Sequence, residues 1–146
     1  SILPGTMPVT LSQAGITVAD NDIIIAGGMT STGQASREIH VFNVQSLNWR
    51  RLPSIPLGLI APALGVLSDG VHVVGGYTNE PLKTHSRHYL LASKARKWQN
   101  IEPLPEARHH AGYAVVDNQL IIMGGAVGSG FFAPFTATDT VYIFKP

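Results

Sequence analysis

The chain of 146 residues contains no cysteine, few charged residues and no long apolar run. Without cysteine, a disulfide framework, a thiolate metal site and a cysteine nucleophile are excluded, although both reducing and oxidising compartments stay open. Ten Lys and Arg against nine Asp and Glu give a formal net charge of +1, so we expect no partnership with nucleic acid or a membrane surface. Every apolar stretch is broken before the roughly 18 residues of a membrane-spanning helix, and no basic segment of signal-peptide type comes first, which predicts a soluble chain.

Sequence signatures of common enzymes are also missing. The chain has no phosphate-binding loop of the G-x-x-x-x-G-K-[ST] type, no G-x-S-x-G elbow and no H-E-x-x-H motif. Its few glutamates form no pair with the spacing of a glycoside hydrolase. The enzyme question stays open, but a non-enzymatic function is favoured, and we expect no catalytic residue, no cofactor and no metal.

What the sequence does contain is an internal repeat of about 49 residues. Three glycine doublets are 48 and 49 residues apart, Trp49 and Trp98 are 49 apart, and a proline lies 19 residues before each doublet. The doublets are Gly27-Gly28, Gly75-Gly76 and Gly124-Gly125, and the prolines are Pro8, Pro56 and Pro105. The predicted repeats are approximately 9–56, 57–105 and 106–146, with 1–8 as the remnant of a fourth strand.

Each repeat predicts a β-hairpin just before its glycine doublet. Two apolar runs of four or five residues, rich in Val and Ile, flank a short turn containing Asp, Asn or Gly, which favours a tight hairpin over a helix. A third strand follows the doublet, and in the first two copies a fourth strand carries the tryptophan. The runs are 16–19 and 23–26, 64–67 and 71–74, 113–116 and 120–123, with third strands at 39–44, 87–91 and 141–144. The predicted fold class is therefore all-β, built of four-stranded antiparallel units.

Three such units cannot cover all of their own sheet faces. A closed ring of four-stranded sheets takes about four to eight units. The third copy reaches Pro146 before its tryptophan position, whereas residues 1–4 align with 50–53 of the first copy, inside a fourth strand. We therefore expect the third unit to be completed by an N-terminal strand or by a partner chain.

The order of these residues resembles the kelch repeat. In the first copy Gly27-Gly28 is followed by Phe42, Trp49 and a Pro53/Pro56 exit, and the resemblance extends over all three copies. It implies a kelch β-propeller fragment of three four-stranded antiparallel blades. The second copy departs from the pattern, with Leu91 in place of the aromatic. The segment 105–110 and the lack of cysteine resemble bacterial kelch proteins more than the animal kelch-like adaptors. A bacterial kelch protein would be periplasmic, whereas a kelch-like adaptor would be cytoplasmic.

Candidate ligand residues are those that differ between copies, because the repeated glycines and tryptophans are explained by the fold. Arg108, His109 and His110 stand where the other copies have 11–13 and 59–61. The kelch resemblance implies that Gln13 and His110 face a ligand at the rim of a central channel. The Arg108 guanidinium would suit a carboxylate. The alternative is that Arg108 and the two histidines only hydrogen-bond loop carbonyls.

A second polar cluster, His85, Arg87 and His88, opens the third strand of the second copy. Side chains three positions apart on a strand point to opposite faces, so the two histidines predict no metal site. His85 or Arg87 could reach the same rim as Arg108. The alternative is that they are ordinary polar residues of a loop and a strand edge.

The longest loop, 126–140, carries three phenylalanines among Gly, Ser and Thr. Clustered exposed aromatics mark partner or ligand surfaces. Phe131 and Phe132 are therefore candidate contact residues, together with Phe135. The alternative is that the loop folds over the ring and covers a channel or an open blade face.

Three functional hypotheses follow from these observations. The favoured one is a binding scaffold that recognises a protein or peptide at the channel rim. The second is a sugar-binding or mutarotase-like activity on a small anionic ligand of the sialic acid type, and the third is a purely structural half-propeller. In each case the predicted assembly is a homodimer making one six-bladed ring, with remaining blades from another chain as the alternative.

Overall fold

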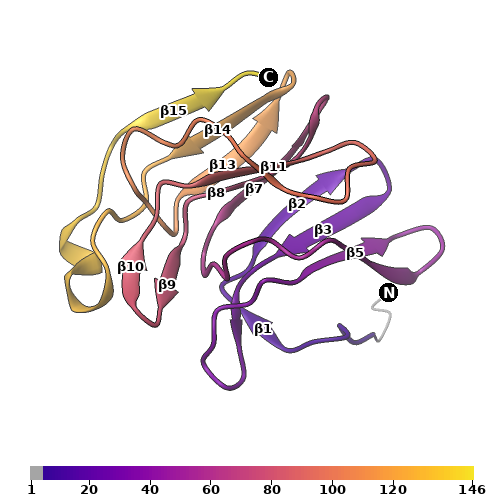
Figure 1. Ribbon diagram of the computed structural model, residues 1–146, viewed down its shortest axis with the longest axis horizontal. Coiled ribbons are helices and arrows are strands. Elements are labelled where there is room, and N and C mark those ends of the chain that lie inside the picture. The colour runs from indigo at the N-terminus through magenta and orange to yellow at the C-terminus, as the bar shows by residue number, and fades with distance from the viewer. Residues whose placement is uncertain (1–4) are drawn as a thin grey trace.

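The computed structural model describes residues 5–146, and its regular secondary structure is almost entirely β-strand (Figure 1). The predicted strand at Ser1–Pro4 lies outside the described residues. The helical part of the described chain is one short 3-10 element, η1 (Gly130–Phe135), and no helix in this range is long and apolar enough to cross a membrane.

Three antiparallel sheets follow one another along the chain, which confirms the predicted fold class. Blade 1 has the strand order β2-β3-β5-β6, blade 2 has the equivalent order β7-β8-β11-β12, and blade 3 has the order β13-β14-β15. The strands of blade 1 are β2 (Gly15–Ala19), β3 (Asp22–Ala26), β5 (Ile39–Asn43) and β6 (Asn48–Leu52); those of blade 2 are β7 (Ala63–Leu67), β8 (Gly70–Val74), β11 (His88–Ala92) and β12 (Gln99–Asn100); those of blade 3 are β13 (Gly112–Val116), β14 (Gln119–Met123) and β15 (Val141–Phe144). Trp49 lies on β6 as predicted, whereas Trp98 stands directly before the short β12.

The hairpin turns adopt the backbone conformations that their residues favour. Asp20, Asp117 and Asn118 have φ of 52°, 48° and 58°, values that Asp and Asn tolerate better than most residues. These turns bring the first two strands of a blade into register, as in the pairing of Ile16 with Ile25. The hairpins predicted from short apolar runs are therefore formed by turn chemistry together with burial.

The core consists of two apolar layers, one between blades 1 and 2 and one between blades 2 and 3. Both faces of blade 2 are covered, so its first strand is largely buried, while the first strands of blades 1 and 3 each leave side chains exposed. The first layer contains Ile24, Ile39, Val41, Ile55, Leu59, Leu64, Val73 and Tyr89; the second contains Ala63, Leu67, Val74, Leu120 and Ile122. Face-to-face packing of successive sheets is the arrangement of propeller-type blades.

The glycine doublets connect each blade to the next. The N–H of Gly28 donates to the carbonyl of Leu59 at 2.8 Å, and the N–H of Gly76 donates to that of Arg108 at 2.8 Å. A Cβ on Gly75 would lie 2.5 Å from the Arg108 carbonyl oxygen, so the first glycine allows the next blade to approach. At Gly124 the nearest atom to such a Cβ is the oxygen of Thr138, at 3.4 Å, because no further blade lies there within residues 5–146.

A second set of bonds joins the residues just before the first strand of each blade. The N–H of Ala61 donates to the Gln13 carbonyl at 2.8 Å, and the N–H of His110 donates to the Ala61 carbonyl at 3.2 Å. Gln13, Ala61 and His110 all adopt the left-handed backbone conformation, with φ of 54°, 51° and 52°. We call these bonds and those of the doublets the interblade ladder; they repeat the same geometry from blade 1 to blade 3.

Candidate functional site

The predicted ligand residues gather toward one end of the blades, the end that carries the glycine doublets. Here the segment between the second and third strands of each blade projects as a loop (Figure 1). In blade 1 it contains β4 (Met29–Thr30), which pairs with β1 (Leu11–Ser12); in blade 2 it is the β9–β10 hairpin (Tyr77–Asn79 and Leu82–Thr84), and in blade 3 it contains η1. Neighbouring loops touch, since the Thr84 and Ser129 hydroxyls lie 2.9 Å apart and the Asn79 side-chain amide donates to the Gly33 carbonyl. The loops of the three blades therefore form one continuous polar and aromatic surface.

Four side chains from all three blades meet at this end, and we call them the inner-edge cluster: Gln13, Tyr77, His109 and His110. His110 Nε2 lies 2.8 Å from Gln13 Oε1, and the Tyr77 hydroxyl donates to the same oxygen at 3.3 Å. The Tyr77 ring also stacks on His110, with ring centroids 5.9 Å apart. Two residues predicted to share a ligand, Gln13 and His110, are thus in direct contact.

The hydrogen-bond partners of the two cluster histidines indicate which of their ring nitrogens carry a hydrogen. His110 Nε2 faces Gln13 Oε1 and His109 Nε2 faces the Gly128 carbonyl at 2.7 Å, so both nitrogens act as donors. The two Nδ1 atoms lie 2.5 Å apart and need one hydrogen between them. Burial, and then the neighbouring His109, lower the pKa of His110. The lowered pKa favours the neutral form of the His110 ring, which lies between Gln13 and His109.

A cavity of about 260 Å³ adjoins this cluster. Its lining comes from the three converging blades: Gln13, Ala14, Ala61, Pro62, His110, Ala111 and Tyr113. The Tyr113 hydroxyl accepts the N–H of Ile16 at 2.7 Å and donates to the Ile16 carbonyl at 3.1 Å, and burial raises its pKa. Tyr113 therefore spans from blade 3 to blade 1 and bounds the cavity.

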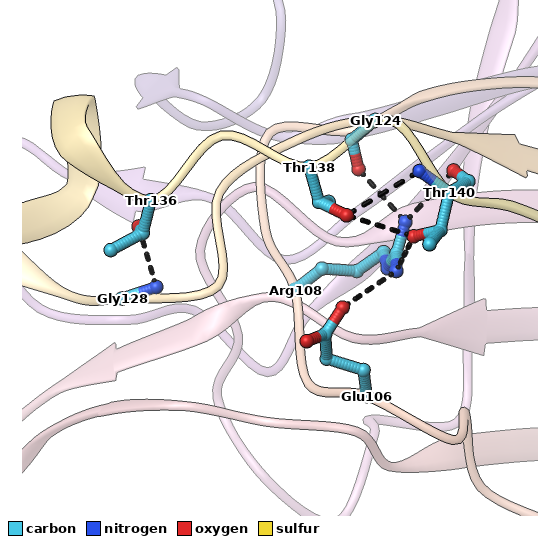
Figure 2. A network of polar contacts seen from close by, with 7 residues as sticks. All are labelled: Glu106, Arg108, Gly124, Gly128, Thr136, Thr138 and Thr140. Atoms are coloured by element: carbon cyan, nitrogen blue, oxygen red, sulfur yellow. Dashed lines mark hydrogen bonds and ion pairs between the residues drawn. The ribbon is translucent and has the colours of Figure 1, made fainter.

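The Arg108 side chain is 1% exposed and points into blade 3 instead of toward this cavity (Figure 2). Nη1 donates to the Gly124 carbonyl at 3.0 Å, while Nη2 donates to Thr140 Oγ1 at 2.6 Å and to Glu106 Oε2 at 3.4 Å. The guanidinium also lies over the Tyr142 ring, 4.3 Å from its centroid. These contacts match the structural alternative for Arg108, and its ligand role stays a prediction.

His85 and Arg87 lie apart from the inner-edge cluster. They line a separate cavity of about 410 Å³ beside the β9–β10 hairpin, which shares no lining residue with the first. His85 Nε2 is 3.1 Å from Thr78 Oγ1, and burial, followed by Lys83 and Arg87, lowers its pKa. His88 begins β11 and is buried beside Phe144, between blades 2 and 3, whereas His85 lies before that strand, so strand periodicity does not relate the two side chains.

Phe131, Phe132 and Phe135 form an exposed aromatic patch on η1. They are 82%, 67% and 77% exposed, and their rings contact mainly one another, with centroids 5.8 and 6.1 Å apart. Leu82 of the neighbouring hairpin is 52% exposed and lies against Gly130, where η1 begins. We call the three phenylalanines together with Leu82 the aromatic patch; all four side chains are exposed to solvent.

Sequence reasoning missed Tyr77 and Tyr113 as site residues. Tyr77 directly follows its glycine doublet, where the other copies have Met29 and Ala126, so comparison of the copies could have found it. Tyr113 had been assigned only to a strand, and its reach across to Ile16 depends on how the blades converge.

The three packed sheets define an all-β chain of propeller-type blades. Residues 10–56 match the kelch motif family model. Over 130 residues, 82% of the chain, it is 30% identical to Kelch-like protein terF of Aspergillus terreus. It is 29% identical to Beta-scruin of Limulus polyphemus over 91% of the chain, and 29% identical to Kelch-like protein 38 of Danio rerio over 74%. The chain belongs to the kelch-repeat family.

The chain spans only a small part of these relatives. It covers 28% of the Aspergillus protein, 15% of Beta-scruin and 18% of the zebrafish protein. The activities and partners of the whole proteins therefore reach this chain only as proposals.

Proposed function

We propose that the chain is a protein-recognition scaffold whose contact surface is the loop-bearing end of the blades. Membership of the kelch-repeat family supports a binding role, and the repeats themselves are accounted for by packing. The surface would combine the aromatic patch with the polar inner-edge cluster. Interfaces of this type use aromatic anchors within a polar surround.

The observation that carries this proposal is the exposure of the aromatic patch. Three phenylalanines on one short element leave a contiguous apolar surface, which soluble proteins seldom retain without a use. The contacts of Thr84 with Ser129 and of Leu82 with Gly130 fix the patch to the neighbouring hairpin. A partner would thus meet an anchored aromatic surface, and less ordering would accompany binding.

The test is selection of binders from a random peptide library displayed on phage, using the full chain as bait. Synthetic copies of the enriched peptides are then titrated against the wild type and against F131S/F132S/F135S. The matched control is Leu47→Ser, because Leu47 is 61% exposed in the turn between β5 and β6, at the opposite end of blade 1. We expect at least tenfold weaker binding to the triple variant and no change for the control. Equal binding to the wild type and the triple variant would place recognition elsewhere.

A second candidate function, binding of a small anionic sugar, is favoured by the inner-edge cluster. Its cavity of about 260 Å³ is lined by residues of three blades, of which Gln13, His110 and Tyr113 carry polar side chains. His110 Nε2 and Gln13 Oε1 lie 2.8 Å apart, and both residues line this cavity, where their polar atoms would hydrogen-bond a sugar hydroxyl. Isothermal titration with sialic acid tests this candidate: His110→Ala should weaken binding, and equal affinities would remove the cluster from the site.

We also propose that the chain works as a homodimer whose two copies close one six-bladed ring. Both outer blades present apolar side chains on their uncovered faces. On blade 1, Ile16 and Val18 are 54% and 66% exposed; on blade 3, Met123, Val141 and Ile143 share the open face and are exposed. Burial of such faces against each other is strongly favourable.

The interblade ladder supports a second copy as the occupant of these faces. On blade 3 the Gly125 N–H and the His110 carbonyl have no partner recorded within residues 5–146, although their equivalents in blades 1 and 2 are bonded to the next blade. On blade 1, Leu11 is equivalent to Leu59 and Arg108, whose carbonyls accept these bonds, and Gln13 is equivalent to Ala61 and His110, whose N–H groups donate them. Blade 1 of one copy therefore carries the backbone groups that could bond the free ladder groups on blade 3 of the other copy. A two-fold axis between the copies would form both of these contacts at once.

A further inference from the structure

The cavity of about 410 Å³ beside the β9–β10 hairpin has a basic lining. It lies between the segment that joins β10 to β11 and the segment that follows β12. Three lining side chains are basic, namely Lys83, His85 and Arg87, and none of the lining residues within 5–146 is acidic. The others are Thr84, Ser86, Asn100, Pro103 and Ala107. We call it the basic cavity; a concave site lined by one sign of charge favours a ligand of the opposite sign.

The glutamates nearest in the sequence do not neutralise this lining. Glu102 lines a different cavity, between blades 2 and 3, and Glu106 pairs with the buried guanidinium described above, at 3.4 Å. Glu80 lies in the turn of the β9–β10 hairpin and does not line the basic cavity. No ion pair is recorded for Lys83 or Arg87 within residues 5–146. Both cations are therefore available to an anionic ligand.

Backbone hydrogen bonds hold the wall that carries the basic side chains. The N–H of His85 and the carbonyl of Arg87 bond the two residues of the blade 2 glycine doublet, both at 2.9 Å. The N–H of Leu104 donates to the carbonyl of Ser86, also at 2.9 Å. The backbone spacing of the basic residues is thus fixed before a ligand arrives, which reduces the ordering that binding requires.

The His85 ring has one nitrogen engaged in the protein and one without a recorded partner. Its Nε2 lies 3.1 Å from Thr78 Oγ1, and this hydroxyl donates its own hydrogen to the Pro81 carbonyl at 2.7 Å. Nε2 must therefore be the donor, so Nδ1 is the nitrogen without hydrogen in the neutral ring. The lowered pKa of His85, caused by burial and then by Lys83 and Arg87, favours this neutral form.

We propose that the basic cavity binds a phosphate group, borne by a monoester or free in solution. A phosphate monoester carries a charge of about −1.5 to −2 at pH 7 and three strong acceptor oxygens. Lys83 and Arg87 supply two positive charges, and His85 becomes a third donor when Nδ1 gains a proton. A carboxylate has one charge and two oxygens, so it would leave one of the cations unpaired. The charges and the donors of the cavity therefore match phosphate better than carboxylate.

The probe is the capped amino acid N-acetyl-O-phosphoserine amide, titrated into the nitrogen-15-labelled full chain and followed by NMR. We expect saturable shifts of the amide signals of 83–87 and Asn100, while those of 16–19 in blade 1 stay unchanged. The matched control probes are the same compound without phosphate and N-acetylglutamic acid amide, and each should bind at least tenfold more weakly. Inorganic phosphate is titrated in the same way to distinguish the two sources of the group.

The K83A/R87A variant should bind the phosphoserine probe at least tenfold more weakly than the wild type. Both side chains are exposed, so the amide spectrum should otherwise stay that of the folded chain. The matched control, R96A/K97A, removes the same two charges from exposed positions of blade 2 outside the cavity and should bind like the wild type. Saturation with the probe should also raise the pKa of His85, because the bound anion offsets the two cations that lower it.

Four results would overturn this proposal. They are the absence of saturable shifts with both phosphate sources, equal affinity of K83A/R87A and the wild type, equal affinity for the phosphoserine and glutamate probes, and an unchanged pKa of His85 at saturation. Tighter binding of phosphoserine than of inorganic phosphate would identify an ester as the ligand, and equal binding would identify free phosphate; both support the site.

The phosphate site and the proposed recognition surface can be tested separately. The phenylalanines of the aromatic patch do not line the basic cavity, so the F131S/F132S/F135S variant should bind the phosphoserine probe like the wild type. Loss of peptide binding in that variant and loss of phosphate binding in K83A/R87A are therefore independent results.

Discussion

Trp98 joins two blades by donating its indole hydrogen to the backbone carbonyl of Pro53, 2.8 Å away. The acceptor belongs to the segment that leaves blade 1, and the donor stands at the outer edge of blade 2. The ring also packs against the apolar layer between these blades. The 49-residue spacing of tryptophans in the sequence thus corresponds to a contact between blades as well as to a position within each blade.

Replacement of Trp98 with alanine should lower the free energy of unfolding by about 2 to 3 kcal/mol, less than a fully buried tryptophan would cost because this ring is half-buried. Urea denaturation followed by circular dichroism measures the change. Trp98→Phe keeps most of the ring but loses the hydrogen bond, and should fall between the wild type and Trp98→Ala. Lys97→Ala, at an exposed neighbour, is the control, and an unchanged midpoint in Trp98→Ala would contradict the interblade role.

Arg108→Ala should destabilise blade 3 by about 2 to 4 kcal/mol, because it leaves the half-buried Gly124 carbonyl without this donor and empties the space over Tyr142. The exposed Arg87→Ala should stay within about 0.5 kcal/mol of the wild type. Thermal unfolding of both variants checks this. If Arg108→Ala were as stable as the wild type but lost binding of sialic acid, the ligand role predicted from the sequence would be favoured over the structural one.

Stability should depend on pH through His88. Burial, then the neighbouring His72, lower the pKa of His88 to about 4, whereas an unfolded histidine titrates near 6.5. Between pH 6.5 and 4 the unfolded state therefore takes up a proton that the folded state does not. As the pH is lowered through this interval, the free energy of unfolding decreases, by on the order of 3 kcal/mol at most. Above pH 6.5 and below pH 4 this group contributes no slope.

Urea titrations at pH 7, 5.5 and 4.5 measure this dependence. His88→Phe keeps an aromatic ring beside Phe144 and removes the titrating group, so its stability should fall less over the same interval. His72 Nδ1 lies 2.8 Å from His88 Nε2, and His72 Nε2 lies 2.8 Å from Asp69 Oδ1, so the variant also removes one hydrogen-bond partner of His72. An identical slope in both proteins would show that His88 is not the group responsible.

The fold could be predicted from the sequence because its determinants are local and repeated. The turn residues Asp20, Asp117 and Asn118 and the short apolar runs defined the hairpins, and β15 begins and ends where its pattern predicted. The prediction placed Trp98 on the fourth strand itself, whereas it precedes β12 by one residue. That difference depends on how the segment before β12 bends toward Pro53, which no local pattern encodes.

The candidate site was predicted less completely. The structure brings Gln13 and His110 into contact, because the repeat places equivalent positions of neighbouring blades near each other, and the shared ligand that the kelch resemblance implies for them stays a prediction. It could not show the direction of the Arg108 side chain, which is determined by Thr140, a residue 32 positions away. The same limit applies to Tyr113, whose hydrogen bonds with Ile16 arise only when blades 1 and 3 converge on blade 2.

The interblade ladder should continue from blade 3 onto blade 1 of a second copy, and sedimentation equilibrium tests this homodimer most directly. The wild type should sediment at twice 15.6 kDa. Gly124→Ala should be a folded monomer, because the equivalent glycine in blade 2 lies against the carbonyl of the next blade. Gly33→Ala also introduces a side chain at positive φ but has open space around it, and it should remain a dimer. A wild type that is a stable, folded monomer of 15.6 kDa would contradict the claim.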